Sequence, residues 1–267
     1  MNRASASAKI NLALVVGPRR EDGYHEIATV LQRIDLADRI ELEPADTIRV
    51  DGFPDDTLVR RALELVSDES GRSWRARVEK HIPVAAGLGG GSSDAATALV
   101  LANETLPEPL PRERMHELAA QLGSDVPFFL TDGPQLATGT GTELERLDLP
   151  QDFWIVLVLP RDVSKASTRD VYAGYDGADG FTERRDALLG ALRSVRNAAD
   201  LAALPANDLA TSPLADELRS SGAFRADVSG AGPTVYGLFL DGQDATIAAG
   251  RFKTRGRVWT TAPAWYG

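Results

Sequence analysis

The chain has 267 residues, of which 43% are hydrophobic and 25% charged, a composition close to the globular average that argues against disorder. Its net charge of −10 argues against non-specific binding to nucleic acid, which needs an electropositive surface. The sequence has no cysteine, which excludes disulfide scaffolds, thiol catalysis and Cys-based metal sites.

The sequence predicts neither a membrane span nor a secretory signal. No run approaches the ~18 apolar residues that span a bilayer, and the apolar stretch Ile10 to Val16 is followed by Gly17-Pro18-Arg19-Arg20 instead of a small-residue cleavage site. We therefore expect a soluble cytoplasmic protein, a monomer or weak homodimer, that binds neither membranes nor nucleic acid. An acidic chain can still bind an anionic ligand through a local loop.

The first half of the chain alternates predicted strands and helices. Residues 8–16 read as a buried strand, 39–50 as further strands and 74–82 as a half-buried strand. Helical spacing of apolar residues predicts a helix from Thr57 to Ser67, with Thr57 as its N-cap. A glycine-rich segment follows Pro83.

Two more helices are predicted after this segment. Ser92 or Ser93 can cap a helix that runs through Ala95 to about Ala102. A second helix fits Arg112 to Leu122, closed by Gly123.

The pattern changes near residue 148. Strand 153–159, helical segments between Ser167 and Ser220, strands 225–228 and 234–240, helix 243–252 and strand 256–261 follow. Without the inserted helices the order is β-α-β-β-α-β, which is the ferredoxin-like signature. The sequence therefore predicts an α+β protein with two domains, 1–148 and 149–267.

The segment Gly87-Leu88-Gly89-Gly90-Gly91-Ser92-Ser93 is the strongest functional signal. Four of these seven residues lack a Cβ, so several backbone N–H groups can turn toward one anion. The N-terminus of the helix that follows adds partial positive charge. The segment fits neither a Walker A loop nor a dinucleotide-binding fingerprint. A flexible linker or a tight strand-to-helix turn is the alternative interpretation.

Three other positions carry weaker signals. Asp125, in a turn before an apolar run, can act as a proton acceptor or simply as a helix N-cap. Lys9 lies inside an apolar strand, so it must pair with an anion or sit at an exposed strand edge. Tyr24 and His25 could stack on a base, although a solvated loop histidine is the plainer interpretation.

Read in order, the motifs resemble a known family. A-K-I-N-L, D-G-Y-H-E, P-x-x-x-G-L-G-G-G-S-S-D-A-A, G-S-D-V-P-F-F, N-D-L and S-G-A-G-P-T-V span most of the chain. This set is similar to the GHMP kinase superfamily and, within it, to the kinases that phosphorylate 4-diphosphocytidyl-2-C-methyl-D-erythritol in non-mevalonate isoprenoid synthesis. The resemblance implies an N-terminal domain like ribosomal protein S5, a C-terminal ferredoxin-like domain and a site in the cleft between them.

The resemblance also implies roles for particular residues. Lys9 and Asp125 match the catalytic lysine and base, and Gly230-Ala231-Gly232 matches a glycine motif that closes the site. The residues that match ATP-binding positions are Pro83, Gly87, Leu88, Gly89, Gly90, Gly91, Ser92 and Ser93. Those that match positions near the cytidine-bearing substrate are Asn11, Tyr24, His25, Thr168 and Tyr172.

Two departures from the family pattern concern ATP. Ala85 and Ala86 stand where the family usually has glycine, and Thr57 stands where it commonly has an asparagine near the adenine. The implied cofactors are ATP and Mg²⁺, and the implied acceptor is the 2-hydroxyl of the methylerythritol unit. The Mg²⁺ ligands are unknown, with Ser92 and Ser93 as candidates.

Two alternatives remain open at this point. The chain could be another kinase of the superfamily, acting on mevalonate, homoserine or a sugar. It could also be a nucleotide-binding protein without catalysis, although the presence of both Lys9 and Asp125 argues against that. A purely structural protein would not require the glycine cluster.

Overall fold

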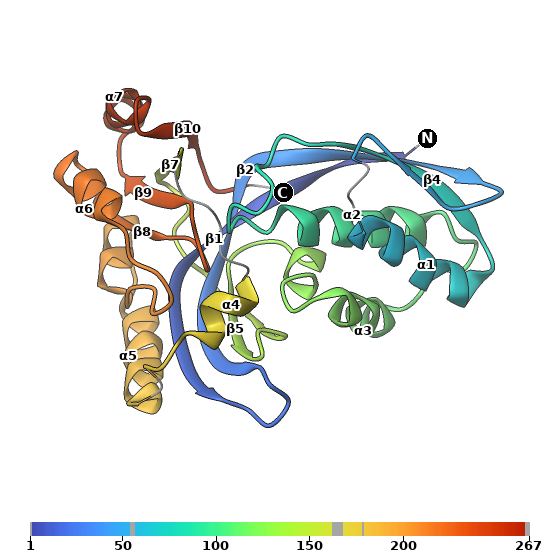
Figure 1. The fold of residues 1–267 in the computed structure, drawn as a ribbon, viewed down its shortest axis with the longest axis horizontal. Coiled ribbons are helices and arrows are strands. Elements are labelled where there is room, and N and C mark those ends of the chain that lie inside the picture. Colours follow the sequence, from blue (N-terminus) through green and yellow to red (C-terminus); the bar gives the residue numbers. More distant parts are fainter. Residues whose placement is uncertain (1, 54–56, 162–167, 178, 265–267) are drawn as a thin grey trace. The chain divides into compact units, whose positions relative to one another are not determined.

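The computed structural model describes residues 2–53, 57–161, 168–177 and 179–264, with only the backbone described at positions 168 and 169. It divides into two compact units (Figure 1). The first comprises Met1–Ala8, Leu36–Val84 and Gly89–Asp132, and the second comprises Lys9–Asp35, Ala85–Leu88 and Gly133–Gly267. Two long strands, β1 (Asn2–Arg19) and β2 (His25–Ala45), contribute to both units. The domain boundary at residues 148 and 149 stays a prediction.

The first unit is a small sheet covered by helices. The C-terminal half of β2 pairs antiparallel with β4 (Ser73–Glu79), and β4 pairs parallel with the short β3 (Arg49–Asp51). Helices α1 (Leu58–Ser70), α2 (Gly90–Glu104) and α3 (Arg112–Leu122) lie on one side of this sheet (Figure 1). A 3-10 helix, η1 (Pro127–Leu130), ends the unit.

Periodicity explains why these elements form. Trp74, Ala76 and Val78 of β4 are buried, while the arginines between them point outward. Helix α1 buries Val59, Ala62, Leu63 and Val66, which share one face at helical spacing. Helix α2 is buried along much of its length, and α1 packs against it.

The second unit contains an antiparallel four-stranded sheet with the order β10-β7-β9-β8. Its strands are β7 (Trp154–Pro160), β8 (Arg225–Val228), β9 (Val235–Phe239) and β10 (Gly256–Thr261). Helices α6 (Pro213–Ser220) and α7 (Gly242–Phe252) contribute apolar residues to the core on this sheet. The predicted β-α-β-β-α-β order is confirmed.

Further elements complete the second unit. The N-terminal half of β2 pairs with β5 (Gln135–Gly139), which pairs with β6 (Glu143–Arg146). Between β7 and β8 lie α4 (Thr168–Ala173), α5 (Phe181–Ser194) and the 3-10 helix η2 (Ala198–Ala203), besides α6. The chain thus has the mixed α+β, two-domain architecture that the sequence predicts.

The structure corrects two local predictions. Strand β2 begins at His25, whereas the sequence analysis predicted no strand between residues 17 and 38. Most residues in the first half of β2 are buried, so the alternation of apolar and polar residues gives no signal there. Helix α2 begins at Gly90 with Gly89 as its N-cap, and no side chain caps it. Ser92 and Ser93 therefore lie inside the first turn instead of capping it.

Candidate active site

The glycine-rich loop ends in the N-terminus of α2. Gly89 has φ 70°, in the left-handed region that glycine enters without a Cβ penalty, and Ser93 N–H donates to Gly89 O at 2.9 Å. By helix geometry the amides of the N-cap and of the next three residues have no acceptor within the helix. They form a group of donors at the positive end of the helix dipole, which suits an anion.

The first part of the loop, Ala85–Leu88, belongs to the second unit and packs on the turn between β8 and β9. Ser229 Oγ donates to Gly87 O at 2.9 Å, and Thr234 N–H donates to Ala86 O at 3.3 Å. A Cβ on Gly87, whose φ is 79°, would lie 2.5 Å from Ser229 O. Only glycine fits at this position.

Lys9 is buried in β1 and belongs to a chain of hydrogen bonds. Its Nζ donates to Asn11 Oδ1 at 2.7 Å, Asn11 Nδ2 donates to Thr29 Oγ1 at 2.8 Å, and Thr29 Oγ1 donates to Ala13 O at 2.7 Å. Lys9 is only 4% exposed, so it is not a lysine at an exposed strand edge. The structure brings the predicted residues Lys9 and Asn11 together.

The C-terminal glycine motif lies against these two side chains. A Cβ on Gly230 would lie 3.3 Å from Asn11 Oδ1 and 3.5 Å from Lys9 Nζ. Asn207, in the N-D-L motif, fixes this turn by donating from Nδ2 to Gly230 O at 2.6 Å and to Val228 O at 2.9 Å. Its role in holding the turn was not predicted, because the sequence gives no indication of these partners.

His25 lies among aromatic rings in the second unit. Its ring centroid is 5.8 Å from that of Tyr172 and 6.0 Å from that of Tyr175, the latter edge-on. Nδ1 is 2.9 Å from Gly17 O. Because a carbonyl only accepts, Nδ1 carries the proton, and Nε2 of a neutral ring is left as an acceptor.

Tyr175 was not predicted as a site residue. Its hydroxyl donates to Gly177 O at 2.6 Å, and Arg184 donates to Asp208 at 3.2 Å and to Val16 O at 2.8 Å. Burial, with the charge of Asp208, raises the pKa of Tyr175. This network fixes the ring of Tyr175 beside His25. The sequence signal that could have identified Tyr175 is its position, three residues after Tyr172.

The remaining predicted residues lie in several different elements. Tyr24 is 62% exposed. Asp125 is half-buried in the turn that precedes η1, whose N-cap position is Val126. Thr57 occupies the N-cap position of α1, but its side chain makes no capping hydrogen bond. The Thr168 side chain lies outside the described residues.

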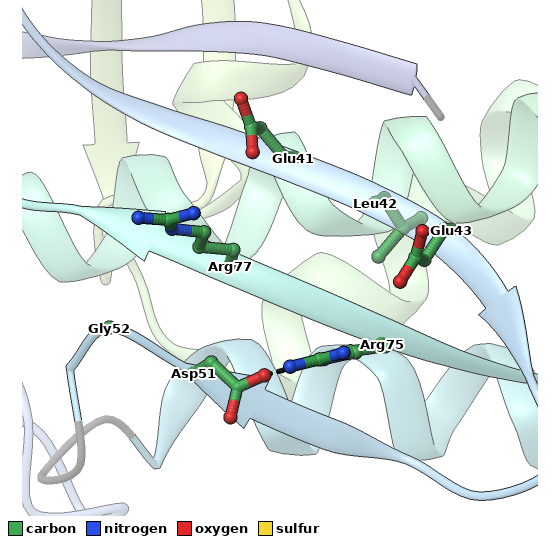
Figure 2. Close-up of a pocket in the computed structure, with 7 residues that line it drawn as sticks. All are labelled: Glu41, Leu42, Glu43, Asp51, Gly52, Arg75 and Arg77. Atoms are coloured by element: carbon green, nitrogen blue, oxygen red, sulfur yellow. Dashed lines mark hydrogen bonds and ion pairs between the residues drawn. The ribbon is translucent and has the colours of Figure 1, made fainter.

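A charged pocket on the first unit involves none of the predicted residues. Figure 2 shows it on the outward face of the sheet, with side chains of β2, β3 and β4 around it. Arg75 donates to Asp51 at 2.6 Å, and in the antiparallel register Glu41 faces Arg77 and Glu43 faces Arg75. These charges face partners of opposite sign across the strands, which is how an uncovered sheet face remains compatible with water.

Comparison with known proteins identifies the family. The model of GHMP kinases N terminal domain matches residues 57–133, and that of GHMP kinases C terminal matches residues 186–258. The 4-diphosphocytidyl-2-C-methyl-D-erythritol kinase of Pelotomaculum thermopropionicum is 40% identical over 94% of this chain and 93% of its own. That of Geobacter sulfurreducens is 39% identical over 96% of both chains.

This chain belongs to the 4-diphosphocytidyl-2-C-methyl-D-erythritol kinase family of GHMP kinases.

Solved structures agree with this assignment. A crystal structure of 4-(cytidine 5'-diphospho)-2C-methyl-D-erythritol kinase superposes with a TM-score of 0.81 at 32% identity, covering 99% of this chain and 100% of that one. A mevalonate kinase superposes with a TM-score of 0.74 at 13% identity, which shows the shared fold alone. The chain is a small-molecule kinase that uses ATP. No helix among the described residues is both long and apolar enough to cross a membrane.

Proposed function

We propose that this kinase transfers the γ-phosphoryl group of ATP to the 2-hydroxyl of 4-diphosphocytidyl-2-C-methyl-D-erythritol, giving the 2-phosphate and ADP. One observation carries the choice of substrate. The ring of His25 is fixed in one tautomer beside two tyrosines, an arrangement that suits a pyrimidine base and has no use in binding mevalonate or homoserine. The similarity to kinases with that name over nearly the whole chain supports it.

Asp125 acts as the proton acceptor in this proposal. The oxygen–hydrogen bond of the acceptor breaks as the oxygen–phosphorus bond forms, and the proton passes to the carboxylate. The bond between the γ-phosphorus and the bridging oxygen breaks, and ADP leaves with its electron pair. The transition state of phosphoryl transfer is loose, so positioning and charge neutralisation contribute most of the catalysis.

Lys9 supplies positive charge for the acceptor oxygen. Its burial strengthens its electrostatic effect, and the hydrogen bond to Asn11 fixes the ammonium group. Gly230 lies against both side chains, so the glycine motif leaves room for a substrate oxygen where a methyl group would intrude. Asn11 therefore serves substrate binding by orienting Lys9 and through its own amide.

The loop from Pro83 to Ser93 holds the phosphates. The donors are the amides at the start of α2, with the hydroxyls of Ser92 and Ser93, and the helix dipole favours the negative charge. Gly87 and Leu88 lie where the loop packs on the β8–β9 turn. Only glycine fits at position 87, because a Cβ there would overlap with this turn.

Magnesium fits this site as an ion carried by the nucleotide. Within the described residues, no three His, Cys, Asp or Glu side chains are grouped as a protein cage would need. The hydroxyls of Ser92 and Ser93 are the oxygen ligands available in the loop, and Mg²⁺ readily keeps water and phosphate oxygens as its other ligands. When bound, the ion neutralises charge on the β- and γ-phosphates.

Cytosine is held by the rings around His25. Nε2 of His25, the ring nitrogen that does not face Gly17 O, can accept a hydrogen bond from the exocyclic amine of cytosine, while Tyr172 and the exposed Tyr24 provide stacking surfaces. Thr168 adds a polar contact. We propose further that the enzyme acts in the cytoplasm as a monomer or weak homodimer, which size-exclusion chromatography would test.

A coupled assay of ADP release tests the function. We expect rapid turnover with ATP, Mg²⁺ and the cytidylated methylerythritol, and little with mevalonate, homoserine or a sugar. Rapid turnover of mevalonate alone would overturn the substrate assignment. Tight ATP binding without transfer to any of these alcohols would favour a nucleotide-binding protein that is not a kinase.

A further inference from the structure

A lysine lies between two buried carboxylates where the glycine-rich segment leaves β4. Nζ of Lys80 donates to Oδ2 of Asp38 on β2, and to Oδ2 of Asp94 on α2 at 2.6 Å. Neither aspartate side chain has exposed surface, and that of Lys80 is 15% exposed. All three residues belong to the first unit, and we refer to them as the lysine triad.

Asp38 also fixes the main chain that follows Lys80. Its Oδ1 accepts hydrogen bonds from the N–H of His81 at 2.5 Å and of Ile82 at 2.8 Å. One carboxylate on β2 thus holds the lysine side chain and the next two amides. The path of the chain into the loop is therefore set by Asp38, and Pro83 restricts it further.

The start of α2 packs directly on this segment. A Cβ on Gly90 would lie 3.0 Å from Ile82 Cγ2 and 3.4 Å from Lys80 Nζ. Lys80 therefore approaches α2 at two positions along the helix. It lies beside the first helical residue, Gly90, and it contacts Asp94 one turn later. Two contacts at different heights fix both the position and the rotation of the first turn.

Folding stability alone does not explain this arrangement. Asp94 Oδ1 is buried and has no hydrogen-bond partner in the described part of the chain. An unsatisfied buried polar atom lowers stability, and well-packed apolar residues often replace a buried ion pair without loss. The triad instead gives the helix start a defined geometry.

We infer that Lys80, Asp38 and Asp94 are positioning residues that hold the first turn of α2, so that the amides of residues 89–92 point at the phosphates of ATP. The inference rests on the proposed function for its ligand. The three residues act through the helix, and their substitution should affect ATP more than the alcohol substrate.

The first test is Lys80→Met in the full chain. We expect the Kd and KM for ATP to rise about 10- to 100-fold, because a small displacement of binding groups has effects of this size. We expect kcat to change less than about threefold and the KM for the cytidylated acceptor to stay constant. Lys253→Met, the same change at an exposed site, is the control and should alter neither.

A second variant separates positioning from folding. Lys80→Met alone leaves buried carboxylates without their cation, which is destabilising. Adding Asp94→Asn removes one of these charges while keeping the side-chain shape, so thermal stability should recover but ATP affinity should not. Lys80→Arg keeps the charge and should restore ATP affinity in part.

Amide hydrogen exchange gives a readout independent of catalysis. The amides of Ser93 and of the next three residues, which bond back into the first turn of α2, should exchange faster in the double variant, and those of α3 should not. Unchanged ATP affinity and unchanged exchange, in a wild-type enzyme that phosphorylates the substrate, would overturn the inference but not the function. Wild-type protein that binds ATP but transfers nothing would overturn the function, while the ATP affinities of the variants would still decide the inference.

Discussion

The two ends of the glycine-rich segment are held by different kinds of interaction. At the α2 end, in the first unit, a lysine and two buried carboxyl groups fix the backbone: Lys80 lies between Asp38 and Asp94. At the other end, in the second unit, uncharged groups hold it: the Ser229 hydroxyl donates to Gly87 O, Thr234 N–H donates to Ala86 O, and the Asn207 carboxamide fixes the turn.

This difference predicts different sensitivities. A backbone held by buried charges should respond to substitutions that remove charge and to pH. A backbone held by close approach of carbonyl groups should respond to added methyl groups and tolerate charge changes nearby. The predictions below test this comparison in order of decreasing effect.

The strongest test of charge-dependent chemistry in the first unit is Asp125→Asn. We expect kcat to fall about 10²- to 10⁴-fold, because the amide cannot accept the hydroxyl proton. The Kd values for both substrates should change little, which rapid-quench and binding measurements can show. Asp68→Asn, on the exposed face of α1, is the control. Wild-type turnover in Asp125→Asn would remove this residue from the mechanism.

Steric sensitivity at the other end is tested by Gly87→Ala. Its Cβ would lie 2.5 Å from Ser229 O and 2.8 Å from Gly232 O at a φ of 79°. We expect the free energy of unfolding to fall by about 2–4 kcal/mol, from backbone strain plus overlap. Gly71→Ala has a similar φ of 67° with nothing within 4 Å, so it measures strain alone. If urea melts showed equal losses in the free energy of unfolding for the two variants, the close approach of Gly87 to Ser229 O would be contradicted.

The aromatic cluster gives a smaller effect on binding. Tyr172→Ala should raise the KM for the cytidylated substrate about 5- to 150-fold, the equivalent of one lost stacking contact. The kcat and the KM for ATP should stay near their wild-type values. Tyr172→Phe keeps the ring and should behave like the wild type. If the Phe variant lost as much as the Ala variant, stacking would not be the role of Tyr172.

Short-range patterns made much of this fold predictable. Alternation along β4 and the order of elements after residue 148 depend on neighbours within about ten positions, and the structure confirms both. The first half of β2 was missed because burial on both faces removes alternation. In a run of glycines, several positions could begin the helix, so the N-cap at Gly89 was missed as well.

Side-chain networks were not predictable for a different reason. Lys80 is 42 positions from Asp38 and 14 from Asp94, and no local pattern links them. The partners of Asn207 lie 21 and 23 positions away. The sequence indicated which residue types could bind ATP and cytosine, but only the folded chain shows what holds Lys9, His25 and α2 in place.

The lysine triad makes the stability of the protein depend on pH in a specific direction. Burial raises the pKa of Asp94 from its ordinary 3.8 to about 7, although the charge of Lys80 acts against this. The folded state therefore binds a proton that the unfolded state releases above about pH 4. The proton on Asp94 therefore contributes its full stabilisation to the folded state below about pH 4. This contribution is lost as the pH rises through about 7. Asp94→Asn cannot titrate, so wild-type stability relative to this variant should fall from pH 4 to pH 8 in urea melts. A difference that stays constant or rises would contradict the shift.

The smallest predicted effect concerns Ala85, the only non-glycine residue with positive φ in the described part of the chain, at 57°. The left-handed conformation costs an alanine about 1–2 kcal/mol, whereas glycine adds roughly 0.4–1 kcal/mol of unfolded-state entropy. Ala85→Gly should therefore stabilise the protein by up to about 1.6 kcal/mol. Ala86→Gly is the matched control: its methyl group is buried and its φ is negative, so the same substitution should destabilise by roughly as much or more. Opposite signs at these adjacent positions would show that backbone conformation, rather than glycine content, determines the stability of this end of the loop. Equal losses in the two variants would mean that Ala85 is not strained.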